Sequence, residues 1–471
     1  MDDLDALGQA AAVVAGEVSA ADLLEAAIAR AEAANPALNF MAQPLYDRAR
    51  AAANGGFSGP FAGVPFLVKD LHVQIAGERS GEGSRLWAGY RATENSVIYD
   101  RYAAAGLNVF GKTTTPELGL TVTTESRATG LTRNPWDLSR SAGGSSGGAA
   151  CAVAAGVVPM AQASDGGGSI RCPASACGVF GMKPSRGRVP MGPRVTESWL
   201  GLSVVHAVSR SVRDNAALLD ATHGSEVGSR YVAPAPEASY LSEVTREPGR
   251  LRIALMLEPL TGVPVDPEVI AATRATAELL ESLGHHVEEA QPQLSGADLG
   301  NAMVAVLGAC TAADIGARLA ALGRDAAGDD IETVTQMFVH IGKRTTALQL
   351  LAANDVFQNA AIVMARFMAT YDIVLSPVFA RPPIELGKID LSPKDMGEWT
   401  ANVLGYSPFT ALYNQTGQPA MSVPLGWSRD GLPIGMMFAG RYGAEGLLYR
   451  LAGQLERAAP WAGKRPPKHL F

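Results

Sequence analysis

Cysteine is scarce in this chain, and its spacing excludes two common classes of small stabilised protein. The 471 residues contain four cysteines, and no two of them form a C-x-x-C pair. A zinc site of the ribbon type needs that spacing, and a disulfide scaffold needs a much higher cysteine content. We therefore predict reduced thiols in a cytoplasmic protein. The four residues are Cys151, Cys172, Cys177 and Cys310.

The chain also lacks any strong excess of positive charge. Charged residues make up 18% of the sequence, the net charge is −7, and lysine and arginine form no dense block. A nucleic-acid-binding surface needs clustered positive charge. We therefore expect no nucleic-acid partner.

Signals for export and for membrane insertion are missing as well. The chain begins MDDLDALG, with acidic residues where a secretory signal carries basic ones. The nearest candidate for a membrane span, residues 149–163, contains Pro159 and has polar flanks. A spanning helix needs about 20 predominantly apolar residues. We expect neither a secretory signal nor a membrane partner.

What is present is a regular alternation of apolar segments, and hydrophobic residues make up 47% of the chain. A helix is expected from Ser19 to Pro36, and a buried strand ends at Lys69. Further helices and strands alternate after it, which predicts an α/β fold with a central sheet. A mostly helical region follows over 296–370, then strands and a closing helix over 372–460. No linker divides these regions, so we predict a single domain over 1–471.

Two glycine- and serine-rich clusters interrupt this pattern, GGSSGG at 143–148 and DGGGSIRCPAS at 165–175. Such composition is typical of flexible linkers, yet both clusters lie between apolar segments. The first also fits the G-x-S-x-G pattern of a nucleophile elbow, which must follow a strand. Because residues 134–142 before it are expected to form a loop, that interpretation is disfavoured. A phosphate-binding loop is excluded, since no Gly-Lys-Ser/Thr sequence follows.

The second cluster contains a candidate catalytic serine, Ser169. Three preceding glycines allow backbone N–H groups to approach a ligand and to bind an oxyanion, although a plain glycine-rich turn fits the same residues. A serine nucleophile needs a base, and none of the seven histidines lies in a catalytic motif. Lys69 is the alternative base, because burial at the end of an apolar run lowers the pKa of a lysine. A lysine that reaches solvent at the strand end fits equally well.

The order and spacing of three motifs favour the catalytic interpretation. AGVPFLVKD, GGSSGGAACAVAAG and SDGGGSIRCPASACGVFGMKPSRGRVP resemble the amidase signature family of serine hydrolases over residues 60–213. The similarity resumes near the C-terminus, in NQTGQPAMSVPLG. The family's two catalytic serines lie 24 residues apart, as Ser145 and Ser169 do here (169 − 145 = 24).

This resemblance implies an amidase signature fold, a central mixed β-sheet covered on both faces by helices. It also implies amide hydrolysis through an acyl-enzyme, with a small-molecule amide as substrate and no metal or organic cofactor. Ser169 would be the nucleophile, Ser145 a bridging serine after a cis peptide bond, and Lys69 a neutral base. The implied oxyanion hole comprises Gly166, Gly167, Gly168 and Ser169, and the implied supporting residues are Ser146, Asp165 and Arg171.

Beyond these motifs, KTTTPELGLTVTTES and LGACTAADIGARL resemble the bacterial branch that acts on 6-aminohexanoate cyclic dimers and nylon oligomers. The resemblance implies that Cys310 and Leu120 line the substrate pocket. The branch is expected to carry an asparagine near Leu120, so this chain departs from the pattern there. Other small or aryl amides, the glutaminase subunit of a tRNA-dependent amidotransferase and a non-catalytic α/β binding protein remain alternatives. The sequence leaves a homodimer open.

Overall fold

Helices and strands alternate along most of the chain in the computed structural model, which describes residues 4–471. Residues 1–3, part of the acidic start considered above, lie outside the described residues. The helices are α1 (Ala6–Val14), α2 (Ala20–Leu38), α3 (Tyr46–Ala53), α4 (Val97–Ala104), α5 (Gly147–Ala154), α6 (Arg171–Cys177), α7 (Val212–Thr222), α8 (Tyr240–Glu243), α9 (Pro267–Ser282), α10 (Gly296–Leu322), α11 (Thr333–Arg344), α12 (Ala347–Phe367), α13 (Met396–Tyr406), α14 (Leu412–Gln415) and α15 (Glu445–Ala458).

The strands form one large sheet and two small two-stranded sheets. The large sheet has the order β1-β3-β2-β8-β10-β9-β14-β15-β13-β11-β12. Its strands are β1 (Met41–Pro44), β2 (Pro65–Lys69), β3 (Asn108–Thr113), β8 (Met160–Asp165), β9 (Phe180–Lys183), β10 (Val204–Ser209), β11 (Arg252–Leu255), β12 (His286–Glu289), β13 (Ile373–Pro377), β14 (Ala420–Trp427) and β15 (Pro433–Ala439). The small sheets pair β4 (Glu125–Ser126) with β5 (Gly130–Leu131) and β6 (Arg133–Asn134) with β7 (Asp137–Ser141).

The large sheet is mixed, which confirms the fold class predicted from the sequence. Strands β3, β2 and β8 run parallel, and so do β13, β11 and β12 at the other end. Between them the pairs from β8 to β13 are antiparallel. Strands from residues 41 to 439 therefore share one sheet.

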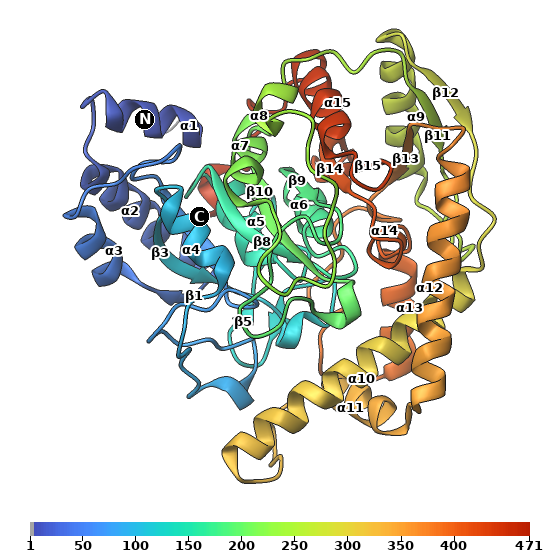
Figure 1. Ribbon diagram of the computed structural model, residues 1–471, viewed down its shortest axis with the longest axis horizontal. Helices are drawn as coiled ribbons and strands as arrows, with labels where there is room; N and C mark the ends of the chain where they lie inside the picture. Colours follow the sequence, from blue (N-terminus) through green and yellow to red (C-terminus); the bar gives the residue numbers. More distant parts are fainter. Residues whose placement is uncertain (1–3) are drawn as a thin grey trace.

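Helices cover both faces of this sheet (Figure 1). Successive side chains of a strand point to opposite faces, and β2 shows the consequence. Phe66 and Val68 pack in the hydrophobic core that also includes α7, α9 and α15. Leu67 packs in the opposite core, against α2 and α5. By the same alternation, Lys69 at the end of β2 belongs to the α5 side.

Helices α10, α11 and α12 lie together at one side of the molecule, and the α10–α11 pair extends away from the sheet (Figure 1). Helix α10 has the length and the mean hydropathy, 1.5, of a helix that could cross a membrane. The sequence alone points to residues 149–163 as the nearest such candidate. That segment contains most of the buried helix α5, whereas α10 carries Leu299, Met303 and Leu307 to the wall of a cavity described below.

Two local expectations from the sequence are wrong. Helix α2 continues past Pro36 to Leu38 and ends at Asn39, whose φ of 53° is left-handed. A proline in the last turn removes only one helical hydrogen bond, so it does not stop the helix there. The segment before GGSSGG is also not a loop, because it contains strand β7, although β7 belongs to a small sheet and not to the central one.

Candidate active site

Lys69 lies at the buried end of β2, with its side chain fully enclosed. Its Nζ is 2.7 Å from Ser145 Oγ and 3.1 Å from Ser164 Oγ. Its backbone N–H donates to the side-chain oxygen of Gln162 at 2.7 Å, which fixes the end of the strand. The amine is therefore held against two hydroxyl groups and does not reach solvent, contrary to the surface alternative left open by the sequence.

Burial lowers the pKa of Lys69 from 10.5 to about 7, although the charges of Asp165 and Glu82 partly oppose this shift. An ammonium group loses its hydration when it is enclosed, so the neutral amine is favoured. Near neutral pH a large fraction of Lys69 is then unprotonated. A neutral amine beside a hydroxyl group can act as a general base.

Ser145 lies in the GGSSGG segment and follows a cis peptide bond, Gly144–Ser145. The glycines around it allow very close packing. A Cβ atom on Gly144 would lie 2.3 Å from the carbonyl oxygen of Thr123, and one on Gly119 would lie 3.1 Å from Ser145 Oγ. Real side chains do not tolerate the first of these distances. The segment is therefore tightly packed and buried, so it is not a linker.

Ser146 begins helix α5 and connects it to the neighbouring strand β8. Its hydroxyl donates to the carbonyl oxygen of Ser164 and accepts the N–H of the same residue, both at 3.2 Å. The residue is fully buried. These two hydrogen bonds hold the Ser145 backbone beside Ser164, the other hydroxyl that Lys69 contacts.

Ser169 lies in the turn between β8 and α6, residues 166–170, with 8% of its surface exposed. The exposed part faces a cavity, because Ser169 and Gly167 both belong to the cavity lining. This is the position that a nucleophile needs, since its oxygen must reach a bound ligand while the rest of the turn stays fixed.

Asp165 and Arg171 form a fully buried ion pair on either side of this turn. Arg171 donates to the two carboxylate oxygens at 2.9 and 3.0 Å, and Asn414 donates to one of them at 2.9 Å. Burial alone would raise the pKa of Asp165, but the charge and hydrogen bonds of Arg171 outweigh it and hold that pKa well below its usual range. The carboxylate is therefore ionised, and it closes the turn that carries Ser169.

Replacing Asp165 with asparagine is expected to destabilise the protein by about 3–5 kcal/mol, because it leaves the buried Arg171 without its counter-charge. Urea unfolding followed by circular dichroism measures this change. Glu25→Gln is the control, since it removes a carboxylate from an ion pair with Arg50 that is about half exposed. Exposed pairs contribute little, so its unfolding midpoint should stay near that of the unmodified protein. Equal midpoints for the two variants would contradict this account of the turn.

The candidate oxyanion hole differs from the sequence prediction at Gly168. Its N–H donates to Asp165 Oδ1 at 2.8 Å, so it is not available to a ligand. Within residues 4–471, the N–H groups of Gly166, Gly167 and Ser169 have no acceptor. The carbonyl of Gly167 is fixed by a 2.5 Å hydrogen bond from Thr410. Three donors beside the cavity therefore remain for an oxyanion.

The cavity next to Ser169 has a volume of about 440 Å³ and is mainly apolar. Among the described residues, those that line it include no aspartate, glutamate, lysine, arginine or histidine. A site of this kind accepts uncharged groups, since nothing in its wall offsets the desolvation of a charge. Its apolar lining includes Leu120, Val122, Leu299, Met303, Leu307, Phe338, Ile341, Trp399, Val403 and Leu412.

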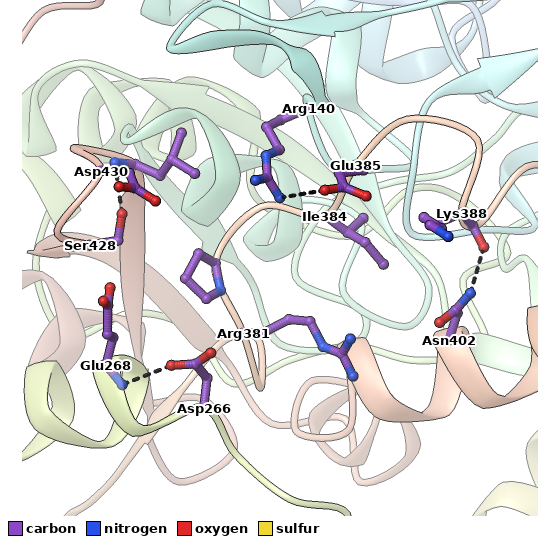
Figure 2. A pocket seen from close by; sticks show the side chains of 12 residues that line it. Arg140, Asp266, Glu268, Arg381, Ile384, Glu385, Lys388, Asn402, Ser428 and Asp430 are labelled. Carbon is purple, nitrogen blue, oxygen red and sulfur yellow. Dashed lines mark hydrogen bonds and ion pairs between the residues drawn. The ribbon is translucent and has the colours of Figure 1, made fainter.

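A second cavity, of about 490 Å³, has the opposite character (Figure 2). Its lining includes three cationic side chains, Arg140, Arg381 and Lys388, together with four carboxylates. In Figure 2 the guanidinium of Arg140 points toward Glu385, and their charged atoms are 3.8 Å apart. None of Lys69, Ser145 and Ser169 lines this cavity. It is therefore separate from the candidate active site.

Of the two residues predicted to line the substrate pocket, one lines the apolar cavity and the other does not. Leu120 belongs to the lining of the apolar cavity, but Cys310 does not. Leu307 is the last residue of α10 in the lining, and Cys310 lies about one turn further along the helix. Burial also raises the pKa of Cys310 to about 11, so it is an uncharged thiol. Cys310 is therefore not among the residues that line this cavity in the structure, and its place in the substrate pocket stays a prediction.

Sequence reasoning missed three residues that hold the site. Ser164 contacts Lys69, Thr410 fixes the Gly167 carbonyl, and Asn414 bonds both Asp165 and Arg171. Ser164 directly precedes the DGGGS cluster, and Asn414 begins the C-terminal motif NQTGQPAMSVPLG, so position next to a motif was the available signal.

Comparisons with known proteins match nearly the whole chain. A family model described as Amidase matches residues 22–449. The 6-aminohexanoate-cyclic-dimer hydrolase of Pseudomonas sp. (strain NK87) is 40% identical over 98% of this chain and 96% of its own length. A solved structure of 6-aminohexanoate cyclic dimer hydrolase with its substrate has a TM-score of 0.94 and 39% identity, covering 99% of each chain. A bacterial aryl acylamidase of the amidase signature family has a TM-score of 0.88 and 28% identity, covering 98% of this chain and 99% of its own.

The family model covers most of the residues that the structure describes, including β2, the turn after β8 and the C-terminal motif. The relatives extend the match over nearly the full length of both chains. These similarities, together with the buried lysine and serine cluster, show that the chain belongs to the amidase signature family and is an amide-hydrolysing enzyme.

Proposed function

We propose that the chain hydrolyses its amide substrate through a relay of Ser169, Ser145 and Lys69. Lys69 takes the hydroxyl proton of Ser145 while Ser145 takes that of Ser169, whose oxygen attacks the carbonyl carbon. The N–H groups of Gly166, Gly167 and Ser169 bind the resulting oxyanion. The proton then returns through Ser145 to the nitrogen, the C–N bond breaks, and the amine leaves. Water attacks the acyl-enzyme through the same relay, which releases the acid and restores Ser169.

The observation that carries this proposal is the 2.7 Å contact between Lys69 Nζ and Ser145 Oγ inside a fully buried site. A lysine with a pKa of about 7 can accept a proton at neutral pH and return it to a leaving amine. Ser164 adds a second contact, which orients the amine. The free N–H groups beside Ser169 supply what a developing oxyanion needs.

We infer that the substrate is an uncharged amide with apolar chains, of which a cyclic aminohexanoate dimer is an example. A solved relative is a hydrolase of this dimer in complex with its substrate. A cyclic dimer has no ammonium or carboxylate terminus, so it enters an apolar cavity without desolvating a charge. The cavity of about 440 Å³ is large enough for a compact ligand of this size class. Aryl amides fit the same reasoning.

The glutaminase alternative is less well supported. Glutamine carries both an α-ammonium and an α-carboxylate, and each needs a partner of opposite charge or several hydrogen bonds. The apolar cavity offers no charged side chain to either group.

We also propose a cytoplasmic location, which is supported by four free cysteines, three of them buried.

A panel of amides tests the proposed substrate class. We expect kcat/KM for the 6-aminohexanoate cyclic dimer and for aryl amides to exceed that for glutamine and for the zwitterionic linear dimer by about 100-fold or more, since burying an unpaired charge costs several kcal/mol. Released amine, quantified by liquid chromatography, measures the rates, with Ser169→Ala as the blank. Faster hydrolysis of glutamine than of the uncharged amides would overturn the assignment.

A further inference from the structure

Gln415 is the only lining residue of the apolar cavity, among those described, that carries a carboxamide side chain. It ends helix α14 and is 97% buried, with 3% of its surface exposed. Its amide nitrogen donates to the carbonyl oxygen of Leu299 on α10 at 3.2 Å. Because a carbonyl oxygen can only accept, this contact fixes which end of the amide faces α10.

The oxygen of the Gln415 amide accepts no hydrogen bond from the described residues. Two other lining residues carry a polar atom without a partner, the Thr121 hydroxyl oxygen and the Trp399 indole nitrogen, but both atoms are enclosed by protein and out of reach of a ligand in the cavity. Buried polar atoms in native proteins are nearly always paired, and each that is not requires an explanation. The Gln415 oxygen is not enclosed in this way, so among these three atoms it is the one that a ligand in the cavity can reach.

We propose that Gln415 determines specificity by accepting the N–H of a second amide in the substrate, remote from the bond that Ser169 attacks. This inference rests on the proposed function and names the substrate class more closely, as uncharged diamides. A secondary amide presents the N–H that this acceptor needs and carries no charge.

Other polar groups are poorer partners for the Gln415 amide oxygen. An ammonium or a carboxylate would need a counter-charge, and the lining has none. An ether or ester presents only acceptors, so it leaves the Gln415 oxygen unpaired in an apolar wall. A site built to bond a polar group rejects analogues that lack it, because its own buried atoms then remain unsatisfied.

The test compares two rings of equal size that differ in one group. The first is the 6-aminohexanoate cyclic dimer, and the second is a lactam in which one of the two amides is replaced by a CH₂–CH₂ unit. With the unmodified enzyme, we expect kcat/KM per scissile amide to be at least about tenfold higher for the diamide. Equal values would overturn the inference, and this comparison requires no variant to fold.

The second arm uses Gln415→Met, which keeps the length of the side chain but removes its acceptor. We expect the diamide preference to fall by about tenfold, toward the ratio of an enzyme without the contact. Leu412→Met is the matched control, since it places the same side chain in the same helix and the same cavity wall. It should keep the preference. An unchanged preference in Gln415→Met, or an equal loss in both variants, would contradict a specificity role.

The two proposals fail in different ways. If the unmodified enzyme hydrolyses neither ring nor any aryl amide, the proposed substrate class is wrong. If it hydrolyses both rings equally well, uncharged amides remain substrates and only the role of Gln415 is rejected. Melting curves of both methionine variants show whether a loss of activity reflects a loss of fold.

Discussion

Replacing Ser169 with alanine is expected to lower the rate of amide hydrolysis by about 10⁴-fold or more, because no other hydroxyl in the turn faces the cavity to attack the substrate. The fold should be retained, since the Asp165–Arg171 pair and the hydrogen bonds of the turn do not use the Ser169 side chain. Steady-state kinetics on the best substrate of the panel, with mass spectrometry to detect an acyl adduct on the unmodified enzyme, measures the effect.

Ser282→Ala serves as the control for this substitution. Ser282 is exposed at the end of α9, where its hydroxyl contacts only its own helix. Its activity should equal that of the unmodified enzyme. Residual activity above about one per cent in Ser169→Ala, in a preparation free of unmodified enzyme, would reject Ser169 as the nucleophile.

Replacing Lys69 with methionine is expected to have a comparable effect on rate, a loss of about 10³-fold or more, since the relay then has no base.

In the unmodified enzyme, the same amine sets the pH dependence of the hydrolysis rate. Lys69 has a pKa of about 7, so the rate should fall about tenfold per unit below that pH as the amine becomes protonated. A rate that stays constant from pH 8 down to pH 5 would contradict a lysine base.

The same substitution is expected to make the protein more stable at neutral pH. The pKa of Lys69 is lowered from 10.5 in the unfolded chain to about 7 in the folded protein, so between these values only the unfolded chain holds the proton. The free energy of unfolding therefore decreases as pH falls through this window, by about 1.4 kcal/mol per unit. Methionine binds no proton in either state, so Lys69→Met removes this decrease in the free energy of unfolding. Melting temperatures should be higher for Lys69→Met at pH 7, and the difference should shrink toward pH 10.5.

Lys183→Met is a matched control for the loss of amide hydrolysis and for the decline of the rate at low pH. Lys183 is a second buried lysine whose pKa is lowered to about 7 by burial, but its Nζ contacts the carbonyl oxygen of Pro184 and not Ser145. We expect this variant to keep amide hydrolysis and its decline below pH 7. If the pH at which the rate of hydrolysis declines shifted in Lys183→Met, Lys183 and not Lys69 would be the titrating group.

Much of this architecture could be predicted from the sequence because local patterns determine it. The apolar run VPFLVK predicted β2. The resemblance to the amidase signature family implied that Lys69 and Ser145 share one site, and their side chains are 2.7 Å apart. Lys69 ends strand β2 and Ser145 lies just before α5, so their relative positions follow once the fold class is known.

The remainder depends on contacts between segments far apart in the sequence. Gly168 fits an oxyanion-hole pattern, but its N–H is taken by Asp165, which only the folded turn reveals. Cys310 lies on a helix that lines the cavity, yet the cavity ends one turn earlier. Thr410 and Gln415 reach the site from more than 200 residues away, and periodicity carries no signal of such a contact.

The hydrogen bonds of Asn414 to the Asp165–Arg171 pair have a consequence for synthesis of the enzyme. Strands β14 and β15, which follow Asn414, occupy the middle of the large sheet although the other described strands all precede them in the chain. A nascent chain that has emerged only as far as α12 therefore lacks both the inner part of its sheet and the partner that closes its catalytic turn. Chains that terminate before Asn414 are therefore expected to lack an assembled amidase site.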